Sequence, residues 1–467
     1  MMLRKIGVGA AVVLMAGCNV GPDYEQTLPD LPKRFVEDQA DATDGASTVD
    51  GLWQSFDLPE LQQLLSLARE HNADIAIALA SLNEARALAG LQIYSLFPTV
   101  TVTGGQERTS QSSLDPFAFP GAAIAERYRA GFDAAWEIDL FGNLRRQSEA
   151  IRRRVEAETN ALYAVELSIV AETAQAYFQW RGSHARIALL QANIANQNEN
   201  VAILEVSLDA GRGTALDIAQ ARAEARRIAA TLPAAIAARV RAEQRLAVLS
   251  GQSAAQIQAM LADTGTTMPS MPAMVAAGNP IDWLLRRPDI FAAERRLAEA
   301  TSIIGVRTAA LYPTINLLGS FGWTGQTSGA IGDDDARRWQ VAPTLDWRFL
   351  DFGRVKQRIT EAEAQASGAM ARFEQTWRLA IEETENALAG YRTTTETVAI
   401  LGDAVGAAEE AARFARLRYQ NGADSYLVVL DAERTSLALK DQQALAMIDR
   451  ATALAALYKA LGGSFVQ

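Results

Sequence analysis

The chain contains one internal repeat, and this repeat limits the folds available to the chain more than any other feature of the sequence. The matched segments are residues 71–100 with 286–315, 136–147 with 347–358, and 210–222 with 421–434. Pro98 falls on Pro313, 215 residues later, and Gly211 falls on Gly422, 211 residues later. The matches keep the same order in both halves. Each half is therefore predicted to be one copy of the same unit: helix, strand, strand, long helix, tight turn and return helix.

Each half contains a pair of predicted strands with one apolar face and one polar face. In YRAGFDAAWEIDLFG, which begins at Tyr128, the even positions are apolar or aromatic and most odd positions are charged or small. The four predicted strands span residues 99–104, 128–141, 314–323 and 339–352. Strands of about ten residues with aromatic side chains toward their ends suit a tilted crossing of a bilayer. We expect the even face, from Tyr128 to Leu140, to meet lipid, and the odd face, with Arg129 and Asp133, to line water.

Four strands are too few to close a membrane barrel, because about eight is the minimum. An open sheet in lipid would leave the N–H and C=O groups of its edges unpaired. If these strands cross a membrane, the barrel must therefore be assembled from several chains.

Two long segments are predicted to be almost continuous helix. Residues 143–206 and 354–420 are rich in Ala, Glu, Arg, Gln and Leu and contain no proline. Helices of this length in water need coiled-coil partners. Pro233 is expected to bend the first return helix locally. A lipid-anchored fibrous coiled coil that conducts nothing would also contain such helices, but it would not account for the strand pairs.

The N-terminus is typical of a bacterial lipoprotein. Arg4 and Lys5 precede an apolar run over residues 6–15, and Ala-Gly precedes Cys18, so residues 1–17 are predicted to be a signal peptide. Cys18 is the one cysteine of the chain and cannot form an internal disulfide. Its position matches the lipobox, where the cysteine receives the lipid.

The formal net charge of −11 argues against nucleic acid as a partner.

The segment CNVGPDY after the lipobox, the ordered repeat, the FPT/YPT pair and the two FG sites together resemble the TolC-like outer membrane factors. The resemblance is to the lipoprotein branch of these outer-membrane efflux proteins, which serves resistance-nodulation-division (RND) pumps. It implies a mixed α and β fold in a homotrimer, with a 12-stranded transmembrane β-barrel continuous with a periplasmic α-helical coiled-coil barrel. It also implies a periplasmic membrane-fusion adaptor, an inner-membrane pump and a location in the outer membrane of a Gram-negative cell.

On this resemblance the chain divides at residues 17, 70 and 285. The expected parts are the signal peptide (1–17), a lipidated N-terminal segment with a periplasmic equatorial region (18–70), the first repeat (71–285) and the second repeat (286–467).

The resemblance also implies a gate at the periplasmic tip, where the turns at Gly211 and Gly422 lie. The implied gate residues are Leu216, Asp217, Tyr419, Asp424, Tyr426, Leu427 and Asp431. The family's inner hairpins open like an iris, and a ring of acidic residues would favour hydrated cations. Alternatively, Asp217 and Asp431 only cap or solvate the start of a helix. Arg212 and Arg418 are candidate salt-bridge partners at the tip.

The strands are expected to pass into helix at two equivalent turns, Phe141-Gly142 and Phe352-Gly353. The DDD run at 333–335 could bind calcium, although a solvated loop tip is the simpler interpretation.

An enzyme is not expected. His71 and His184 lie in separate helical stretches, and no nucleophile elbow, P-loop or cysteine-rich metal site is present in the sequence. No cofactor or metal site is predicted. A duct for type I protein secretion or for metal efflux would use the same fold, and the sequence does not separate these from drug efflux.

Overall fold

The computed structural model describes residues 19–26, 34–37, 52–110, 112, 124–211, 213–275, 279–280, 283 and 286–463. The predicted signal peptide, Cys18 and Arg212 lie outside the described residues. The chain forms two compact units. We call residues 1–28, 81–159 and 292–374 the sheet unit, and residues 29–80, 160–291 and 375–467 the hairpin unit. Each unit draws segments from both halves of the repeat.

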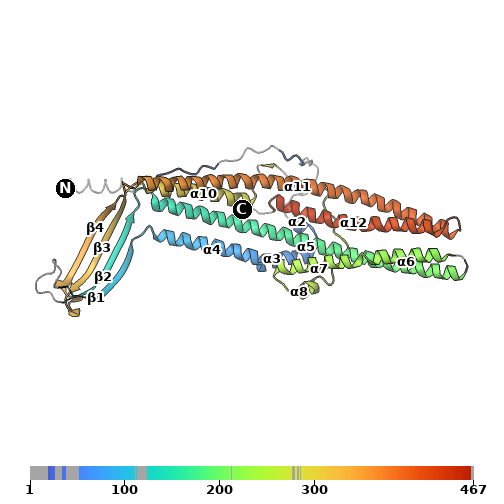
Figure 1. Cartoon of the computed structure of the whole chain (residues 1–467), viewed down its shortest axis with the longest axis horizontal. Coiled ribbons are helices and arrows are strands. Elements are labelled where there is room, and N and C mark those ends of the chain that lie inside the picture. The colour runs from blue at the N-terminus through green and yellow to red at the C-terminus, as the bar shows by residue number, and fades with distance from the viewer. Residues whose placement is uncertain are drawn as a thin grey trace. The chain divides into compact units, whose positions relative to one another are not determined.

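The sheet unit contains one antiparallel sheet of four strands (Figure 1). Its strands are β1 (Thr99–Thr109), β2 (Ala125–Ile138), β3 (Thr314–Gly325) and β4 (Arg337–Asp346), paired in the order β1-β2-β3-β4. The register sets Phe132 opposite both Val102 and Phe321, and Phe321 opposite Trp339. The two predicted strand pairs are confirmed, and the register joins them through β2 and β3.

The predicted strand ends are partly wrong. The first strand runs to Thr109 rather than 104, β2 ends at Ile138 rather than 141, and β4 ends at Asp346 rather than 352. Leu140, which we placed on the apolar face of the strand, donates its N–H to Ile138 O at 2.9 Å and so lies in a local turn. A turn bond of this kind takes a residue out of the alternating ladder, although its side chain continues the period-two pattern.

Between the strands, the second loop contains two short 3₁₀ turns, η1 (Ser328–Ala330) and η2 (Asp334–Ala336). Asp334 pairs with Arg337 at 3.3 Å. Among the described residues no cluster of three His, Cys, Asp or Glu side chains could hold a metal ion, and this includes the DDD run.

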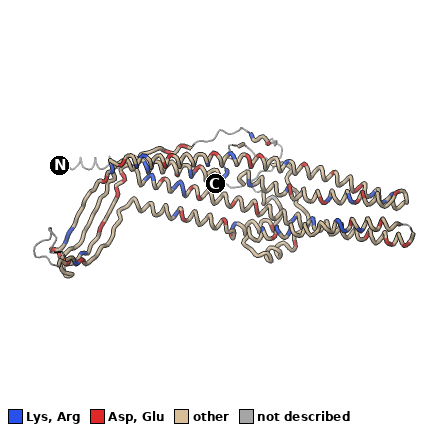
Figure 2. Tube along the Cα trace, viewed as in Figure 1, with Lys and Arg blue, Asp and Glu red and all other residues tan. Residues whose placement is uncertain are grey.

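The long helices are α5 (Asn143–Asp209, 67 residues) and α11 (Phe352–Gln420, 69 residues). Both predictions are confirmed, and at ~1.5 Å per residue each helix is roughly 100 Å long. Lys and Arg are interspersed with Asp and Glu along these helices (Figure 2), as expected for helix surfaces with a solvated side. Two further helices precede the strand pairs, α4 (Ala73–Tyr94) and α10 (Pro288–Ala309).

The return helices of the two halves differ. The first return consists of α6 (Ala215–Ala229) and α7 (Leu232–Ser250), whereas the second is the unbroken α12 (Tyr426–Ala460). Pro233 lies in the first turn of α7. The predicted bend thus lies where Ala230 and Thr231 separate the two helices, and both residues keep helical backbone angles.

The core of the hairpin unit includes two short N-terminal helices, α2 (Leu52–Ser55) and α3 (Pro59–His71). Trp53 of α2 packs on Tyr458 of α12, with 4.9 Å between the ring centroids, and Leu61 and Leu64 of α3 are fully buried. A short helix, α8 (Ala254–Met260), follows α7. No helix of the described part of the chain is both long and apolar enough to cross a membrane.

Candidate functional site

The two tip turns have the same backbone conformation. Gly211 ends the segment after α5 with φ of 72°, and Gly422 follows α11 with φ of 72°. Their N–H groups donate to Leu208 O at 2.8 Å and to Tyr419 O at 2.9 Å. Positive φ is costly for any side chain with a Cβ atom, so both turns require glycine.

After the first turn, Asp217 caps its own helix. Thr214 Oγ1 accepts from the N–H of Asp217 at 3.2 Å, and Asp217 Oδ2 accepts from the N–H of Thr214 at 3.0 Å. This capping box satisfies two donors that the first turn of a helix leaves free. Asp217 therefore caps the start of α6. Leu216, next to it, is 64% exposed.

After the second turn, the acidic residues have basic partners instead. Arg418 Nη2 donates to Asp424 Oδ1 at 3.0 Å, and this hydrogen bond lowers the pKa of the Asp424 carboxyl group. Asp431 accepts from Arg434 at 2.6 Å on an exposed face of α12. Arg418 is thus a salt-bridge partner at the tip, as we suggested. Leu427 is exposed, like Leu216.

The two tyrosines of the predicted gate pack on each other. Tyr419 and Tyr426 make an edge-to-face contact with 5.6 Å between ring centroids. Tyr426 belongs to a small core that joins the two hairpins, α5–α6 and α11–α12. The core residues are Leu204, Ile218, Ala221, Ala415, Tyr426, Val429 and Leu430. Burial, and then the nearby Glu433 carboxylate, raise the pKa of Tyr426 to about 12.

The predicted turns between strand and helix are not equivalent. Gly142 has φ of 82°, and a Cβ atom there would lie 2.2 Å from Asn19 Oδ1. Gly353, in contrast, lies in the first turn of α11, which begins at Phe352. Phe141 stacks on Tyr312 with 4.7 Å between ring centroids. The tyrosine of the YPT motif in the second half thus packs on the junction of the first half.

A buried arginine that the sequence did not single out holds the segment after Cys18 in the sheet unit. Arg146, which is 1% exposed, donates to Val20 O at 3.1 Å, to Gly21 O at 3.3 Å and to Asp23 Oδ1 at 2.7 Å. A Cβ atom on Gly21 would lie 2.4 Å from the Cα of Gly305. The repeat already singles out Gly305, which matches Gly90, but nothing in the sequence indicates that Arg146 is buried beside it.

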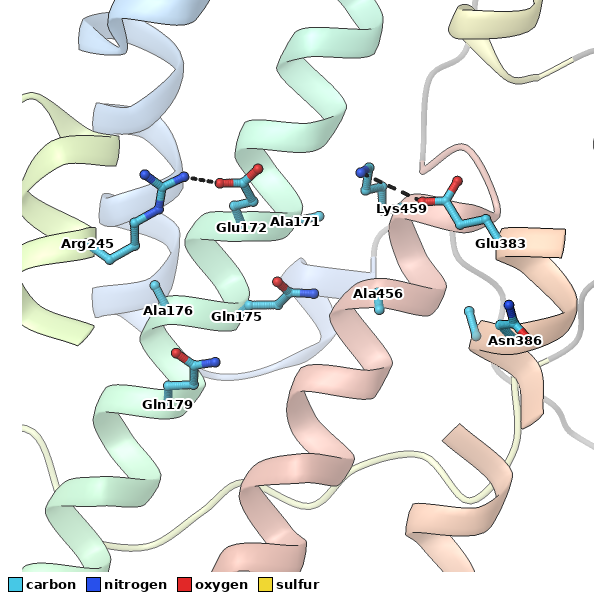
Figure 3. A pocket seen from close by; sticks show the side chains of 11 residues that line it. Ala171, Glu172, Gln175, Ala176, Gln179, Arg245, Glu383, Asn386, Ala456 and Lys459 are labelled. Atoms are coloured by element: carbon cyan, nitrogen blue, oxygen red, sulfur yellow. Dashed lines mark hydrogen bonds and ion pairs between the residues drawn. The ribbon is translucent and has the colours of Figure 1, made fainter. Parts of the chain in front are cut away.

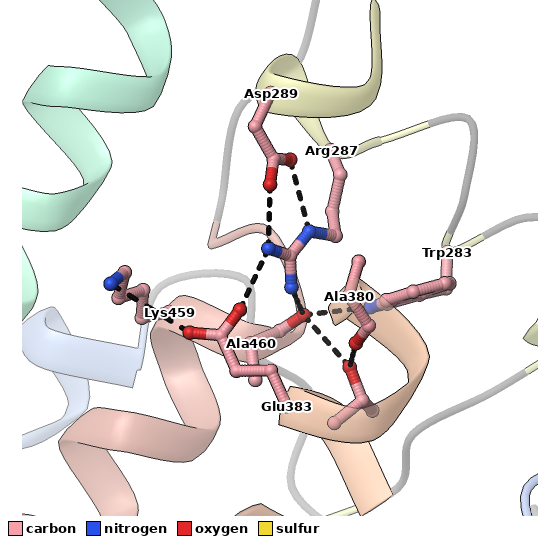
Figure 4. Close-up of polar contacts among 8 residues, drawn as sticks. Trp283, Arg287, Asp289, Ala380, Glu383, Lys459 and Ala460 are labelled. Atoms are coloured by element: carbon pink, nitrogen blue, oxygen red, sulfur yellow. Dashed lines mark hydrogen bonds and ion pairs between the residues drawn. The ribbon is translucent and has the colours of Figure 1, made fainter. Parts of the chain in front are cut away.

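A second buried arginine closes the end of α12 in the hairpin unit (Figure 4). Arg287 forms two hydrogen bonds with Asp289, at 2.7 and 3.0 Å, and one with Glu383 at 2.7 Å. Its Nη1 and the Trp283 Nε1 both donate to Ala460 O, at 2.9 and 2.7 Å. One guanidinium group therefore bonds to two carboxylates and a helix-terminal carbonyl.

The hairpin unit also contains a polar cavity of about 680 Å³ between α5, α7, α11 and α12 (Figure 3). Glu172 pairs with Arg245 on one side of it, and Glu383 with Lys459, at 3.7 Å, on the other. Most of the remaining lining is glutamine, asparagine and alanine. None of the predicted gate residues lines this cavity.

In the sheet unit, the register places apolar side chains from all four strands on one face. This face contains Val100, Val102, Phe132, Trp136, Ile315, Leu317, Phe321, Trp339, Val341 and Leu345. The opposite face is polar, and on it Thr103 donates to Asp133 at 2.9 Å. The predicted division of the faces is confirmed.

Comparisons with known proteins identify the family. The family model described as "Outer membrane efflux protein" matches residues 64–252 and 280–463. The chain belongs to this family of outer-membrane efflux proteins. This match supports the predicted fold class, the predicted channel function and the predicted location in the outer membrane. Each matched segment contains one of the two tip turns, at Gly211 or Gly422.

Relatives of this efflux protein cover almost its whole length. Outer membrane protein OprJ of Pseudomonas aeruginosa is 30% identical over 99% of this chain and 97% of its own. The solvent efflux pump outer membrane protein SrpC of Pseudomonas putida is 30% identical over 97% of both chains. The solved outer-membrane channel OprN is 36% identical, with a TM-score of 0.86 over 96% of this chain and 99% of its own. The open-state MtrE channel of Neisseria gonorrhoeae is 28% identical, with a TM-score of 0.84 over 96% and 98%.

Proposed function

We propose that three copies of this efflux protein close their sheets into one 12-stranded barrel that forms the exit duct of a tripartite efflux system. The observation that carries the proposal is the apolar face that continues across all four strands, together with β1 and β4 at the two edges of the sheet. In lipid those edges need partners, and β1 of one chain can pair with β4 of the next.

In this assembly the apolar face meets outer-membrane lipid, and Cys18, after removal of residues 1–17, receives the lipid anchor. Residues 18–70 supply the N-terminal and equatorial segment, and the two repeats, 71–285 and 286–467, supply two strands and one tip hairpin each. The docking of Val20 and Gly21 on Arg146 supports an anchor beside the strand-to-helix junction, because Asn19 lies against Gly142.

The hairpin tips form the gate. Leu216 and Leu427 are exposed on a single chain, as side chains that meet their copies around a three-fold axis would be. Asp217, Asp424 and Asp431 place carboxylates at the same tips, and carboxylates around a narrow axis favour cations. A periplasmic membrane-fusion adaptor engages the tips and moves the hairpins outward, and an RND-type inner-membrane pump supplies the cargo. The name of the relative SrpC, a solvent efflux pump outer membrane protein, supports small solutes such as solvents as cargo rather than proteins or metals.

The test is conductance of the purified full chain in planar bilayers. We expect trimers that resist heat in detergent, a small resting conductance, and a larger one in the double variant Asp217→Ala/Asp431→Ala. The loop variant Asp335→Ala is the control, because it removes an exposed acid outside the tips. Protein that inserts and never conducts, even as the double variant, would rule out the channel and favour a non-conducting coiled-coil spacer.

A further inference from the structure

The four strands of the sheet lead into loops at one end and are joined to helices α4, α5, α10 and α11 at the other. We call the first the loop end: β1 and β3 finish there, and β2 and β4 begin there. In the proposed duct the loop end opens to the outside of the cell, because the long helices extend into the periplasm.

Three arginines lie near the loop end on the polar face of the sheet. Arg127 and Arg129 alternate with apolar residues of β2 and share a face with Asp133, and Arg338 occupies the same face of β4. Arg338 is exposed and has no ion pair with another described residue. One carboxylate, that of Glu107, lies 3.8 Å from Arg127 and 3.6 Å from Arg129. This part of the face therefore carries a charge of +2 per chain.

The part of the polar face closer to the helices is acidic. Asp133 and Glu137 of β2 and Asp346 of β4 lie there, and the described strands place no basic residue among them. Charge on this face is thus separated along the strands instead of being mixed. Like charges that gather on one part of a face repel one another, so the stability of the sheet alone favours a mixed arrangement.

Two glycines keep the wall beside Arg338 bare. Gly131 of β2 and Gly322 of β3 face each other in the register, and neither position has room for a Cβ atom. No side chain therefore projects between Arg338 on β4 and Thr103 on β1. A polar cavity of about 350 Å³ adjoins this bare wall, and its polar lining includes Arg338, Asp133, Ser320, Gln340 and Thr101.

We propose that Arg127, Arg129 and Arg338 form an anion-selective collar in the barrel wall. The collar attracts solutes that carry a carboxylate, phosphate or sulfonate group, and its sign is opposite to that of the carboxylates at the tips. This inference rests on the proposed barrel, in which three copies bring nine arginines and three glutamates around one lumen. Rings of arginine select anions in pores, and a lumen with low-dielectric walls strengthens their field.

The first test measures the local potential and does not require conduction. Thr324 of β3 lies opposite Arg129 on the polar face, so Thr324→Cys places a thiol beside the collar. Its rates of reaction with an anionic and a cationic methanethiosulfonate are each divided by the rate for free cysteine. The chain without the new thiol measures the background from Cys18. We expect a preference for the anionic reagent, and Arg129→Gln/Arg338→Gln should reduce it about tenfold.

The matched control for this test is Arg337→Gln. Arg337 precedes Arg338 in the chain but shares the apolar face with Trp339, so it carries the same charge at the same level on the other side of the wall. The collar is wrong if Arg337→Gln lowers the preference as much as the double variant does. It is also wrong if the parent protein shows no preference, as it would if the exposed aspartates at 333–335 neutralised the arginines.

A pair of single variants covers the case in which the double variant forms no heat-resistant trimers. Arg338→Lys keeps the positive charge of an exposed side chain, and Arg338→Gln removes it. The collar requires that only Arg338→Gln lowers the preference for the anionic reagent. Equal rates in these two variants would show that the arginine acts through its shape or not at all.

The second test measures permeation as the reversal potential in a KCl gradient. In Asp217→Ala/Asp431→Ala, the added change Arg129→Gln/Arg338→Gln should shift this potential toward that of a potassium-selective pore, whereas added Arg337→Gln should not. The shift should be larger near 0.1 M salt than near 1 M, because the Debye length falls from about 10 Å to about 3 Å. A reversal potential that ignores the loss of both arginines at low salt would contradict the collar.

The two proposals fail in different ways. If no variant ever conducts but the reagent preference is present and depends on the arginines, the gated channel is wrong and the collar stands as an anion-attracting band. If the channel conducts as expected and neither the reagent preference nor the reversal potential depends on Arg129 and Arg338, the collar alone is wrong.

Discussion

Asn72 and Arg287 make equivalent hydrogen bonds in the two halves of the chain. Asn72 Nδ2 donates to Leu249 O at 3.0 Å, and Arg287 Nη1 donates to Ala460 O at 2.9 Å. The donors are 215 residues apart and the acceptors 211, the two offsets of the repeat. In each half, the residue before the first repeat helix thus bonds to the end of the return helix, and a glycine of positive φ follows that helix, Gly251 or Gly462.

Replacing the buried Arg287 by Met should destabilise the hairpin unit strongly. The change removes the guanidinium partner of Asp289 and leaves Glu383 with Lys459 alone, and because both carboxylates are partly exposed we expect a loss of about 1–3 kcal/mol. Chemical denaturation of the detergent-solubilised protein measures this change in the free energy of unfolding. The control is Arg286→Met, a change of the neighbouring exposed residue. Its free energy of unfolding should lie within about 0.5 kcal/mol of the wild-type value. Equal stability of the two variants would mean that the Arg287 bonds contribute little.

Gly305→Ala should displace the segment after Cys18. The new Cβ atom would lie 2.8 Å from Arg146 Nε, and Arg146 holds Val20 and Gly21. Faster proteolysis near residues 19–26 is the expected readout. Gly90→Ala is the matched control, because Gly90 is the repeat equivalent and nothing lies within 4 Å of its added Cβ. That change should be neutral or stabilise helix α4 by about 0.5–1 kcal/mol.

Gly131→Ala should prevent proper pairing of β2 with β3. A Cβ atom there would lie 2.5 Å from Phe321 O, a backbone atom that cannot move without shifting its strand. We expect few or no heat-resistant trimers on a gel after mild heating. Gly105→Ala, on β1 with nothing within 4 Å of its Cβ, should assemble normally. Normal trimers of Gly131→Ala would show that the sheet tolerates a wider strand spacing.

Accessibility along β1 should alternate with period two. A nitroxide placed through Val102→Cys should be reached preferentially by oxygen dissolved in lipid, and one at Thr101→Cys by a water-soluble nickel complex. Val102 shares its face with Phe132 and Phe321, whereas Thr101 lies opposite Asp133. The measurement is power saturation in reconstituted vesicles. Equal access of both reagents to both sites would contradict a lipid-facing apolar face.

Tyr426→Phe should change the response of the protein to alkaline pH. The pKa of Tyr426 is raised from its ordinary value near 10 to about 12, so the folded protein holds this proton more tightly than the unfolded chain does. Its stabilising contribution is complete below pH 10 and is lost as the pH rises from 10 to 12. Tyr426→Phe should lack that part of the loss, and the exposed Tyr94→Phe should keep it.

At neutral pH, Tyr426→Phe should be as stable as the wild type or more stable by about 1 kcal/mol. The Tyr426 hydroxyl group is buried and has no hydrogen-bond partner among the described residues, so its removal leaves nothing unpaired. A stability loss above about 1 kcal/mol would point to a partner for this hydroxyl group in the assembled protein.

Most of the fold could be predicted because its signals are local or periodic. Gly211 and Gly422 mark the tip turns. Both have positive φ, which explains why glycine recurs at these two positions 211 residues apart. Alternation gave the strands and their faces. It could not give the ends of β2 and β4, because Leu140 continues the pattern of side chains after the backbone has left the ladder.

The contacts between distant segments could not be predicted. Arg146 and Arg287 are ordinary charged residues in helical sequence, and their roles depend on burial by segments more than a hundred residues away. Asp217 illustrates a different limit. From the sequence, the same aspartate fits both a gate residue and a helix cap, and the structure shows its capping box.

The interruption at Pro233 makes the two hairpins mechanically different. In α12 an unbroken hydrogen-bond ladder runs from Tyr426 to Ala460, roughly 50 Å at ~1.5 Å per residue, so a load applied at the second tip reaches Arg287 through a single stiff rod. In the first half Ala230 and Thr231 separate two helices and Pro233 donates no N–H, so this limb can bend there more easily. The repeat thus gives each chain one return limb that can bend near its middle and one that is continuous, although both limbs derive from the same repeated unit.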